Sequence, residues 1–337
     1  RISGEGNDRT PLKGDIRLTD SEVRDILALD KKFTRFMLVL NVGGVVDLSP
    51  VMSVRNILLL SQLGVETGGA LADILLGKAN PSGKLTTTWA AFEEYPEMPD
   101  FEDMNETRYR EGIYVGYKYY ETRYEDFVTG NGNAGDYAYG DIVAYPFGYG
   151  LSYTSYDISD MKVNYNAADD TYTVTVKVTN TGDMAGKKTV QVYVQSPYTD
   201  YDKQNGVEKS AVSLVGFGKT GMIEPGASET LSMTVNKRDI ASYDTYGAGT
   251  YILDAGDYYF TAATDAHNAV NNILAAKGYT VESTNGKMTA DGNADLTYTW
   301  TEDALDTTTY ATSENGTAIT NQLSCADPNL YEGIEET

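Results

Sequence analysis

The stretch Phe36-Met37-Leu38-Val39-Leu40-Asn41-Val42 is a nearly continuous apolar run that ends in Gly43-Gly44. Such a run is typical of a strand buried on both faces of a parallel sheet. Residues 57–60 repeat the pattern, and residues 67–77 then predict a helix with Gly77 just past its end. Because strand and helix alternate, we expect an α/β fold with a parallel sheet and read Gly43-Gly44 as a tight strand-to-helix turn.

The segment before this strand combines a helix start with a carboxylate framed by glycines. Thr19-Asp20-Ser21-Glu22 predicts a capping box, with a helix to about Lys32. Upstream, Glu5 lies between Gly4 and Gly6. Glycines lack the Cβ that would crowd a ligand, so this carboxyl group could enter a confined space. In parallel sheets, ligands bind beyond the carboxyl ends of the strands, where this loop would lie. A solvated loop tip is the alternative that the residues alone leave open.

From Tyr156 onward the hydrophobic pattern changes to a period of two. Short strands are predicted at 172–178, 190–194, 231–235 and 256–263, with turn residues between them. This spacing indicates an antiparallel β-sandwich. A helix from about His267 to Lys277 is predicted to interrupt the sandwich, and we expect His267 to be structural. We therefore expect an α/β domain over 1–153, an all-β sandwich over 154–302 with a helical insertion near 267–278, and a polar linker over 303–337.

Composition excludes several classes of function. A net charge of −23 and a pI near 4.3 disfavour nucleic acid and anionic membranes as partners. The single histidine excludes multi-histidine metal sites, and the single cysteine, Cys325, excludes an internal disulfide. Neither glycine-rich nucleotide-binding motif is matched, so no cofactor or metal is expected. Acid–base chemistry would fall to carboxylates, lysine or tyrosine. We expect a strand of the same sheet before Arg1, so the absence of a targeting signal leaves the compartment open.

Four stretches stand in the order found in one enzyme family: Arg1-Ile2-Ser3-Gly4-Glu5-Gly6-Asn7-Asp8-Arg9, Asn80-Pro81-Ser82-Gly83-Lys84-Leu85, residues 111–117 (EGIYVGY) and residues 146–153 (PFGYGLSY). In this order they resemble glycoside hydrolase family 3, the β-glucosidase family. Residues 176–182 (VKVTNTG) resemble the start of that family's fibronectin type III-like domain. The resemblance covers about residues 1–300.

The resemblance implies a three-part enzyme. A TIM-like barrel carries the nucleophilic Asp, an α/β sandwich domain carries the acid/base Glu, and a fibronectin type III-like domain completes the protein. Glu5 matches the acid/base position. Asn7 falls at a position that contacts substrate in some relatives, and Asp8 and Arg9 match a pair that we assign to positioning the loop.

The sequence departs from the family pattern because it contains no barrel. The Ser-Asp-Trp motif of the nucleophile is also missing, so that residue would lie outside this chain. Residues 318–323 and 326–329 resemble the connector of a permuted subgroup whose barrel comes last. We therefore expect these 337 residues to be the front portion of a longer polypeptide. The barrel would be a domain of the same protein or a separate chain after cleavage.

The resemblance implies a retaining exo-β-glycosidase acting on terminal β-D-glucosyl residues, with the isolated chain inactive. In such enzymes two carboxyl groups about 5–5.5 Å apart act as nucleophile and as acid/base. A β-xylosidase remains open. A β-N-acetylglucosaminidase is disfavoured, since an Asp-His pair on the barrel replaces the acid/base Glu in that branch. A non-catalytic carbohydrate-binding or adhesion module is the alternative from another class. A homo-oligomer is among the assemblies compatible with the sequence.

Overall fold

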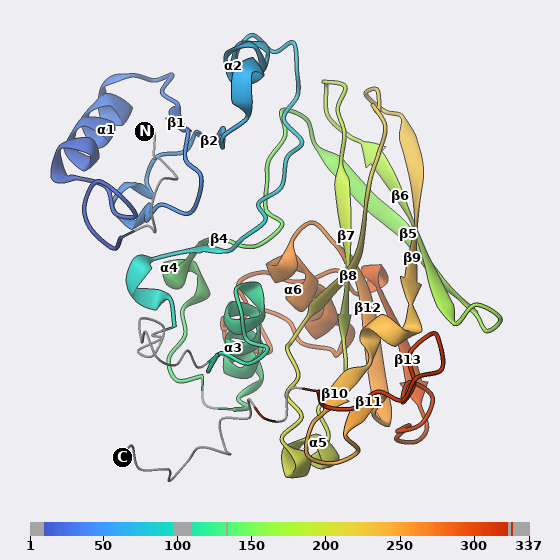
Figure 1. The fold of residues 1–337 in the computed structure, drawn as a ribbon. Coiled ribbons are helices and arrows are strands. Elements are labelled where there is room, and N and C mark those ends of the chain that lie inside the picture. The colour runs from blue at the N-terminus through green and yellow to red at the C-terminus, as the bar shows by residue number, and fades with distance from the viewer. Residues whose placement is uncertain (1–9, 97–108, 133, 323–324, 326–337) are drawn as a thin grey trace, which may run out of the picture.

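The computed structural model describes residues 10–96, 109–132, 134–322 and 325. An α/β unit, with α1, β1, β2 and α2, occupies one end of the molecule (Figure 1). Strands β5 to β9, β12 and β13 form a sandwich beside it, and α3, α4 and α6 lie against the sandwich below the α/β unit. The predicted order, an α/β part followed by a β-sandwich, is confirmed.

The α/β unit is built around a two-stranded parallel sheet. β1 (Leu38–Leu40) pairs with β2 (Ile57–Leu59), so the two apolar runs form the predicted parallel strands. α1 (Asp20–Lys32) has the expected capping box, in which the Glu22 amide donates to Thr19 Oγ1 at 3.2 Å. α2 (Thr67–Leu75) follows β2, and Gly77 adopts a φ of 68° just beyond it. A buried cluster joins the strands to the segments around them: Leu18, Leu38, Leu40, Val42, Val46, Leu48, Val51, Val54 and Trp89.

The turn at Gly43-Gly44 does not lead into the α-helix that the sequence predicted. After Gly43-Gly44 the chain enters a short 3-10 helix, η1 (Ser49–Val51), in place of an α-helix. The Ser49 amide and hydroxyl both donate to Asp47 Oδ1, which favours a local turn over helix propagation. A second 3-10 helix, η2 (Gly64–Glu66), precedes α2.

A helix that the pattern did not predict follows the acidic segment after β3 (Trp89–Ala90) and η3 (Phe92–Glu94). α3 (Tyr117–Thr129) buries Tyr120, Tyr124 and Val128 on one face. The helical spacing of these residues is obscured in the sequence by the other tyrosines around them. α4 (Tyr139–Ile142) leads into β4 (Val143–Tyr145), which pairs with β3.

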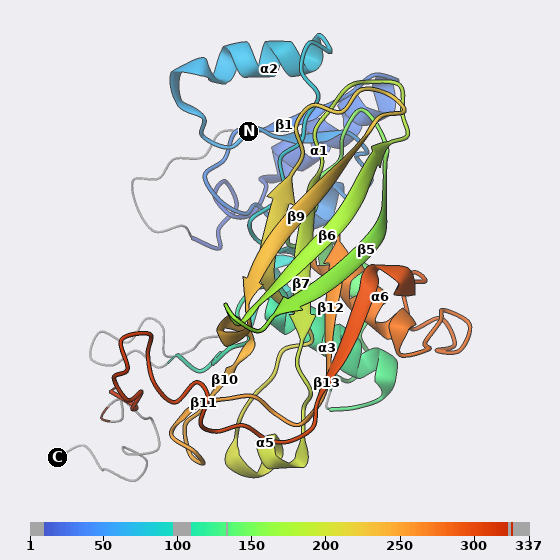
Figure 2. The ribbon, with the colours of Figure 1, turned by 90° about the vertical axis from the view of Figure 1, so that its right-hand side faces the viewer.

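The sandwich consists of two antiparallel sheets. The first has the order β5-β6-β9, with β5 (Tyr156–Asn166), β6 (Thr171–Asn180) and β9 (Ser228–Asn236). The second has the order β13-β12-β7-β8, with β7 (Thr189–Gln195), β8 (Ser213–Lys219), β12 (Gly256–Ala263) and β13 (Thr297–Glu302). Figure 2 looks onto the first sheet, with β7 and β12 behind it. Between the sheets lie alternate side chains such as Val174, Val176, Val190 and Val192, as the period of two predicts.

The central strands of the second sheet, β7 and most of β12, are buried on both faces. The insertion predicted near 267–278 is α6 (Ala266–Ala276), capped by Asp265, and it packs with α3 and α4 on the outer face of β7 and β12. Every residue of β7 is therefore buried. At the far end of the sandwich lie α5 (Asp200–Asn205), η4 (Lys237–Ile240) and the hairpin of β10 (Ser242–Asp244) and β11 (Thr250–Ile252). A last turn, η5 (Ala294–Leu296), precedes β13.

Part of the segment predicted as a linker is fastened to the sandwich. Asp306 pairs with Leu253 in an isolated bridge, and the buried Tyr310 donates its hydroxyl to Asp170 Oδ2 at 2.7 Å. The polar composition of 303–337 gave no sign of these two anchors. Cys325, the single cysteine of the sequence, is exposed and forms no disulfide within the chain. Among the described helices, none has the length and apolar character of a membrane span.

Candidate functional site

The residues assigned to the site by sequence, Glu5, Asn7, Asp8 and Arg9, lie outside the described residues. Their roles therefore stay predictions. The structure does describe the chain from Thr10 onward, and it shows how the segment that follows Glu5 is anchored to the α/β unit.

Residues 10–18 form a compact turn beside the chain that follows β1. The Thr10 amide donates to Asp15 Oδ2 at 2.7 Å. Gly14 adopts a φ of 100°, a backbone conformation that would be strained for a residue with a side chain. The Asp47 amide then donates to the Ile16 carbonyl at 2.8 Å, and Arg17 pairs with Asp47 in a parallel bridge. This segment thus lies on the carboxyl side of β1, the edge where parallel sheets place their ligand sites.

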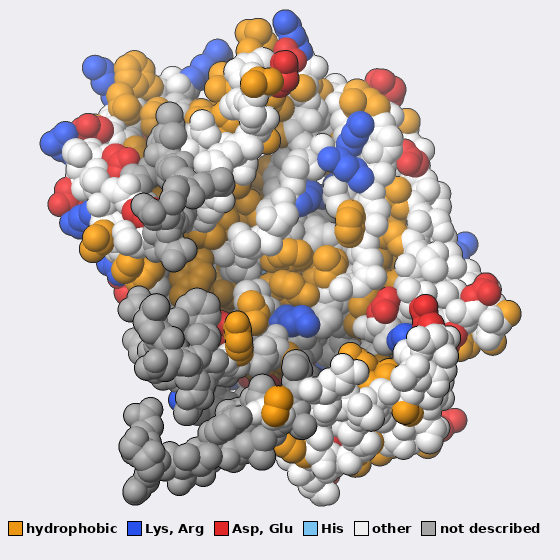
Figure 3. All heavy atoms as spheres, in the orientation of Figure 1, with side chains coloured by type: hydrophobic (Ala, Val, Ile, Leu, Met, Phe, Trp, Pro, Cys, Tyr) orange, Lys and Arg blue, Asp and Glu red, His pale blue; other side chains and the backbone are white. Residues whose placement is uncertain are grey.

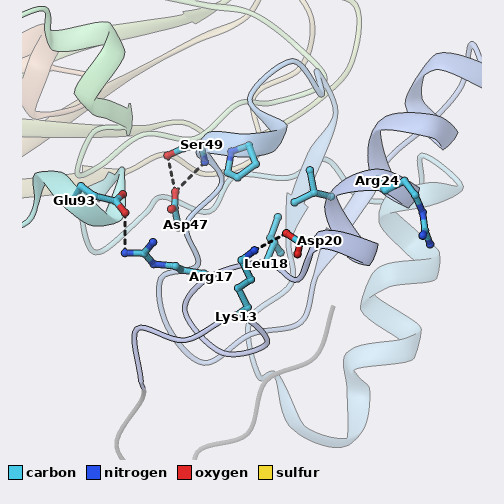
Figure 4. Close-up of a pocket in the computed structure, with 10 residues that line it drawn as sticks. Lys13, Arg17, Leu18, Asp20, Arg24, Asp47, Ser49 and Glu93 are labelled. Carbon is cyan, nitrogen blue, oxygen red and sulfur yellow. Dashed lines mark hydrogen bonds and ion pairs between the residues drawn. The ribbon is translucent and has the colours of Figure 1, made fainter.

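A cavity of about 510 Å³ opens between this turn, the start of α1 and η1 (Figure 4). Its wall is rich in charged side chains, most of them paired with one another. Lys13 Nζ lies 2.6 Å from Asp20 Oδ1, and Arg17 Nη2 lies 2.7 Å from Glu93 Oε1. The lining residues are Lys13, Arg17, Leu18, Asp20, Val23, Arg24, Asp47, Ser49, Pro50 and Glu93.

Arg17 connects the turn to η3. Its guanidinium lies 4.5 Å from the centre of the Phe92 ring and contacts Glu93, so both the charge and the plane of the group are used. Asp47, only 7% exposed, is held by Ser49. The carboxylates of Asp47 and Glu93 therefore already have partners. Together with Arg17, these two residues are suited to fixing the geometry of this edge of the sheet. Within the described ranges, no group of three His, Cys, Asp or Glu side chains could hold a metal ion.

Sequence reasoning missed Arg17, Asp47 and Glu93. Asp47 follows a buried strand and a Gly-Gly turn, so the rule on the carboxyl ends of parallel strands could have selected it. Arg17 and Glu93 are far apart in the sequence and share no spacing that predicts contact.

His267 is structural, as expected. It joins a network between α3 and α6: its Nδ1 lies 2.9 Å from Glu121 Oε2, and its Nε2 lies 2.7 Å from Thr289 Oγ1. Glu121 is fully buried and also accepts the hydroxyl of Tyr139 at 2.5 Å. Burial, and then the charge of Glu121, raise the pKa of the Tyr139 hydroxyl well above its ordinary value. The Tyr139 ring stacks on His267 at 3.6 Å, so the network is packed as well as hydrogen-bonded.

Two further motifs from the sequence meet at the junction between the α/β unit and the sandwich. The Leu85 amide donates to the Tyr149 carbonyl at 2.9 Å, and the Gly148 amide returns a bond to the Leu85 carbonyl at 2.8 Å. Gly150 packs against Gly83 so closely that a Cβ would lie 2.3 Å from the Gly83 carbonyl oxygen. Residues 80–85 and 146–153 therefore form a structural joint between the two parts of the chain.

Comparison with known proteins identifies both parts. Residues 1–117 match the family described as the glycosyl hydrolase family 3 C-terminal domain, and residues 188–266 match the fibronectin type III-like domain. β-Glucosidase A of Butyrivibrio fibrisolvens is 36% identical over 299 residues, which are 82% of this chain and 34% of that protein. A β-glucosidase of Ruminococcus albus is 34% identical over 276 residues, 80% of this chain and 27% of that protein.

A solved structure gives the same similarity. β-Glucosidase 3B from Thermotoga neapolitana, in complex with α-D-glucose, aligns with a TM-score of 0.68 and 32% identity, over 91% of this chain and 37% of that chain. This chain thus spans about a third of the length of these relatives.

Proposed function

Because the chain belongs to glycosyl hydrolase family 3, we propose that it forms part of a retaining exo-β-glycosidase, a β-glucosidase that releases terminal β-D-glucosyl residues. The observation that carries this proposal is the continuous similarity to β-glucosidases across both parts of the chain. A shared fold alone would be weaker support, since one fold serves many functions.

In this proposal Glu5 is the general acid/base. It protonates the leaving oxygen while an Asp of a barrel domain outside this chain attacks the anomeric carbon, and it then deprotonates the water that releases the sugar. When the loop and the barrel close around the substrate, water would be excluded from the carboxyl group of Glu5. This desolvation would raise the pKa of Glu5 toward the working pH. Asn7 would contact the substrate, and Asp8 and Arg9 would position the loop.

Residues 10–18, which follow the loop that carries Glu5, support the proposal that this loop delivers a catalytic group to a second domain. A catalytic group delivered to a second domain needs a rigid support, because an error of about 1 Å weakens catalysis. Residues 10–18 provide such a support through the bonds of Thr10 to Asp15 and of Ile16 to Asp47. The contact of Arg17 with Glu93 ties the same turn to η3.

The proposal is tested by comparing the barrel-containing protein with residues 1–337 alone on aryl β-glucosides and aryl β-xylosides. We expect the longer protein to prefer the glucoside and the isolated chain to hydrolyse neither. Turnover by the purified isolated chain would contradict a nucleophile located elsewhere. If the longer protein favours xylosides, the substrate sugar is xylose and the proposed mechanism is unchanged.

A further inference from the structure

A lysine from the α/β unit is fixed at the joint between the two parts of the chain. Lys84 belongs to the turn of residues 80–85, and its ammonium group donates to the Gly150 carbonyl oxygen. The turn is itself fastened to the sandwich, since Asn80 Nδ2 donates to the Ala185 carbonyl at 3.2 Å. The ammonium group of Lys84 is therefore held in a defined place.

Two further lysines reach this joint from the sandwich. Lys188 precedes β7; its amide donates to Thr220 Oγ1 at 3.0 Å, and its Nζ lies 5.9 Å from the centre of the Tyr156 ring. The hydroxyl of Tyr156 lies beside Asn80, because a Cβ on Gly186 would come within 2.6 Å of both side chains. Lys219, at the end of β8, is paired with Thr189, the residue after Lys188. Basic side chains accordingly gather around a hollow near the ends of β7 and β8 (Figure 3).

The positive charge of this group is only partly balanced. Within the described part of the chain, none of the three lysines forms an ion pair with a carboxylate, although the whole chain carries a net charge of −23. The charge of Asp265 favours the protonated form of both Lys84 and Lys188. The oxygens of Asp265 already accept hydrogen bonds from the Asn268 amide, which caps α6, and from the Thr264 hydroxyl. Burial, followed by repulsion from Lys188, lowers the pKa of Lys84 to about 8. Burial also lowers the pKa of Lys188.

We propose that this joint binds a small oxyanion, inorganic phosphate or the phosphate group of a sugar phosphate, between the ammonium groups of Lys84 and Lys188. Each ammonium group would donate a charge-assisted hydrogen bond, and Lys219 would add attraction from the edge of the site. The anion replaces the repulsion between the two lysines by attraction to both. Because the lysines come from different parts of the chain, a bound anion would also fasten the α/β unit to the sandwich. This inference is independent of the role of Glu5.

The test is calorimetric titration of the 337-residue chain with sodium phosphate at pH 7, alongside thermal unfolding in phosphate and in sodium chloride of equal ionic strength. A ligand that binds the folded state raises the unfolding temperature. We therefore expect phosphate to raise it and chloride of the same ionic strength to have a smaller effect. Binding of sulfate, an oxyanion whose charge is constant over this range, should weaken as the pH rises through about 8, where Lys84 loses its proton.

Matched variants locate the site. Lys188→Gln should weaken phosphate binding at least tenfold, whereas Lys188→Arg should retain it. Lys162→Gln, which removes the same charge from an exposed position of β5, should bind as the unchanged protein does. Tighter binding of glucose 6-phosphate that is lost in Lys188→Gln would identify a sugar phosphate, and equal affinity would identify the free anion. Equal effects of phosphate and chloride, or unchanged binding by Lys188→Gln, would overturn the proposal.

Discussion

The side-chain amide of Asn80 donates to the carbonyl oxygen of Ala185 at 3.2 Å, across 105 positions of the sequence. The same side chain accepts hydrogen bonds from the Ser152 hydroxyl and the Tyr153 amide, both at 2.8 Å. One asparagine thus connects the turn of 80–85, the segment before β5 and the loop before β7. Only an amide side chain offers a donor and an acceptor in this arrangement.

Replacing Asn80 by Ala should destabilise the chain by about 2 kcal/mol, since an intramolecular hydrogen bond contributes roughly 1 kcal/mol and the half-buried Asn80 makes three. Denaturant unfolding of the purified chain measures the change. Asn164→Ala is the control, because Asn164 is exposed on β5. Equal stability of the two variants would show that Asn80 does not fasten the joint.

His267 should be coupled energetically to Glu121. His267→Ala removes a hydrogen-bond partner of a fully buried carboxylate that is also bonded to Tyr139, so we expect a loss of about 2–4 kcal/mol. Adding Glu121→Gln should recover part of that loss, because the uncompensated charge disappears. A double-mutant cycle should give a coupling of about 1–3 kcal/mol. Strict additivity would contradict a shared network.

Asp126 should make stability depend on pH. Burial, with repulsion from Glu125, raises the pKa of its carboxyl group from an ordinary 3.8 to about 6. A carboxyl group whose folded pKa is raised stabilises the fold fully below its unfolded pKa and loses that contribution as the pH rises through about 6. Asp126→Asn does not titrate, so it should be more stable than the parent at pH 7.5 by about 1 kcal/mol, a figure reduced for solvent screening.

The Asp126→Asn gain should vanish near pH 4, where the parent carboxyl group is protonated. Urea unfolding at the two pH values measures it. Asp136→Asn removes the same charge from an exposed position and serves as the control. A gain that is equal at both pH values would refute this origin of the effect.

The sequence predicted the elements whose signals are local. The apolar run at 36–42, the capping box of Thr19 and Glu22, and the period of two in β6 each depend on residues that are close in sequence, and all are confirmed. β7 is confirmed as a strand, but all of its residues are buried, because helices cover its outer face. The family resemblance is confirmed as well. It could be recognised from the sequence because its motifs lie along most of the chain.

Features that depend on tertiary contact could not be predicted in this way. α3 was missed because its buried tyrosines, Tyr120 and Tyr124, are preceded by the half-buried Tyr117 and Tyr119, so its apolar periodicity is weak. The contact of Arg17 with Glu93 joins distant segments, and so do the hydrogen bonds of Asn80 to Ala185 and of Lys84 to Gly150. The motif at 80–85 was recognised, but its role in joining the α/β unit to the sandwich emerges only from its bonds to 148–153 and Ala185.

The central claim is that Glu5 donates the proton to the leaving group. The most direct measurement is kcat/KM of Glu5→Gln in the barrel-containing protein, on a series of aryl β-glucosides whose leaving groups differ in pKa. Poor leaving groups need protonation, so we expect a loss of about 10²–10⁴-fold for them and a much smaller loss for the best leaving groups. An unchanged kcat/KM across the whole series, or an equal loss for every substrate, would contradict the assignment of Glu5.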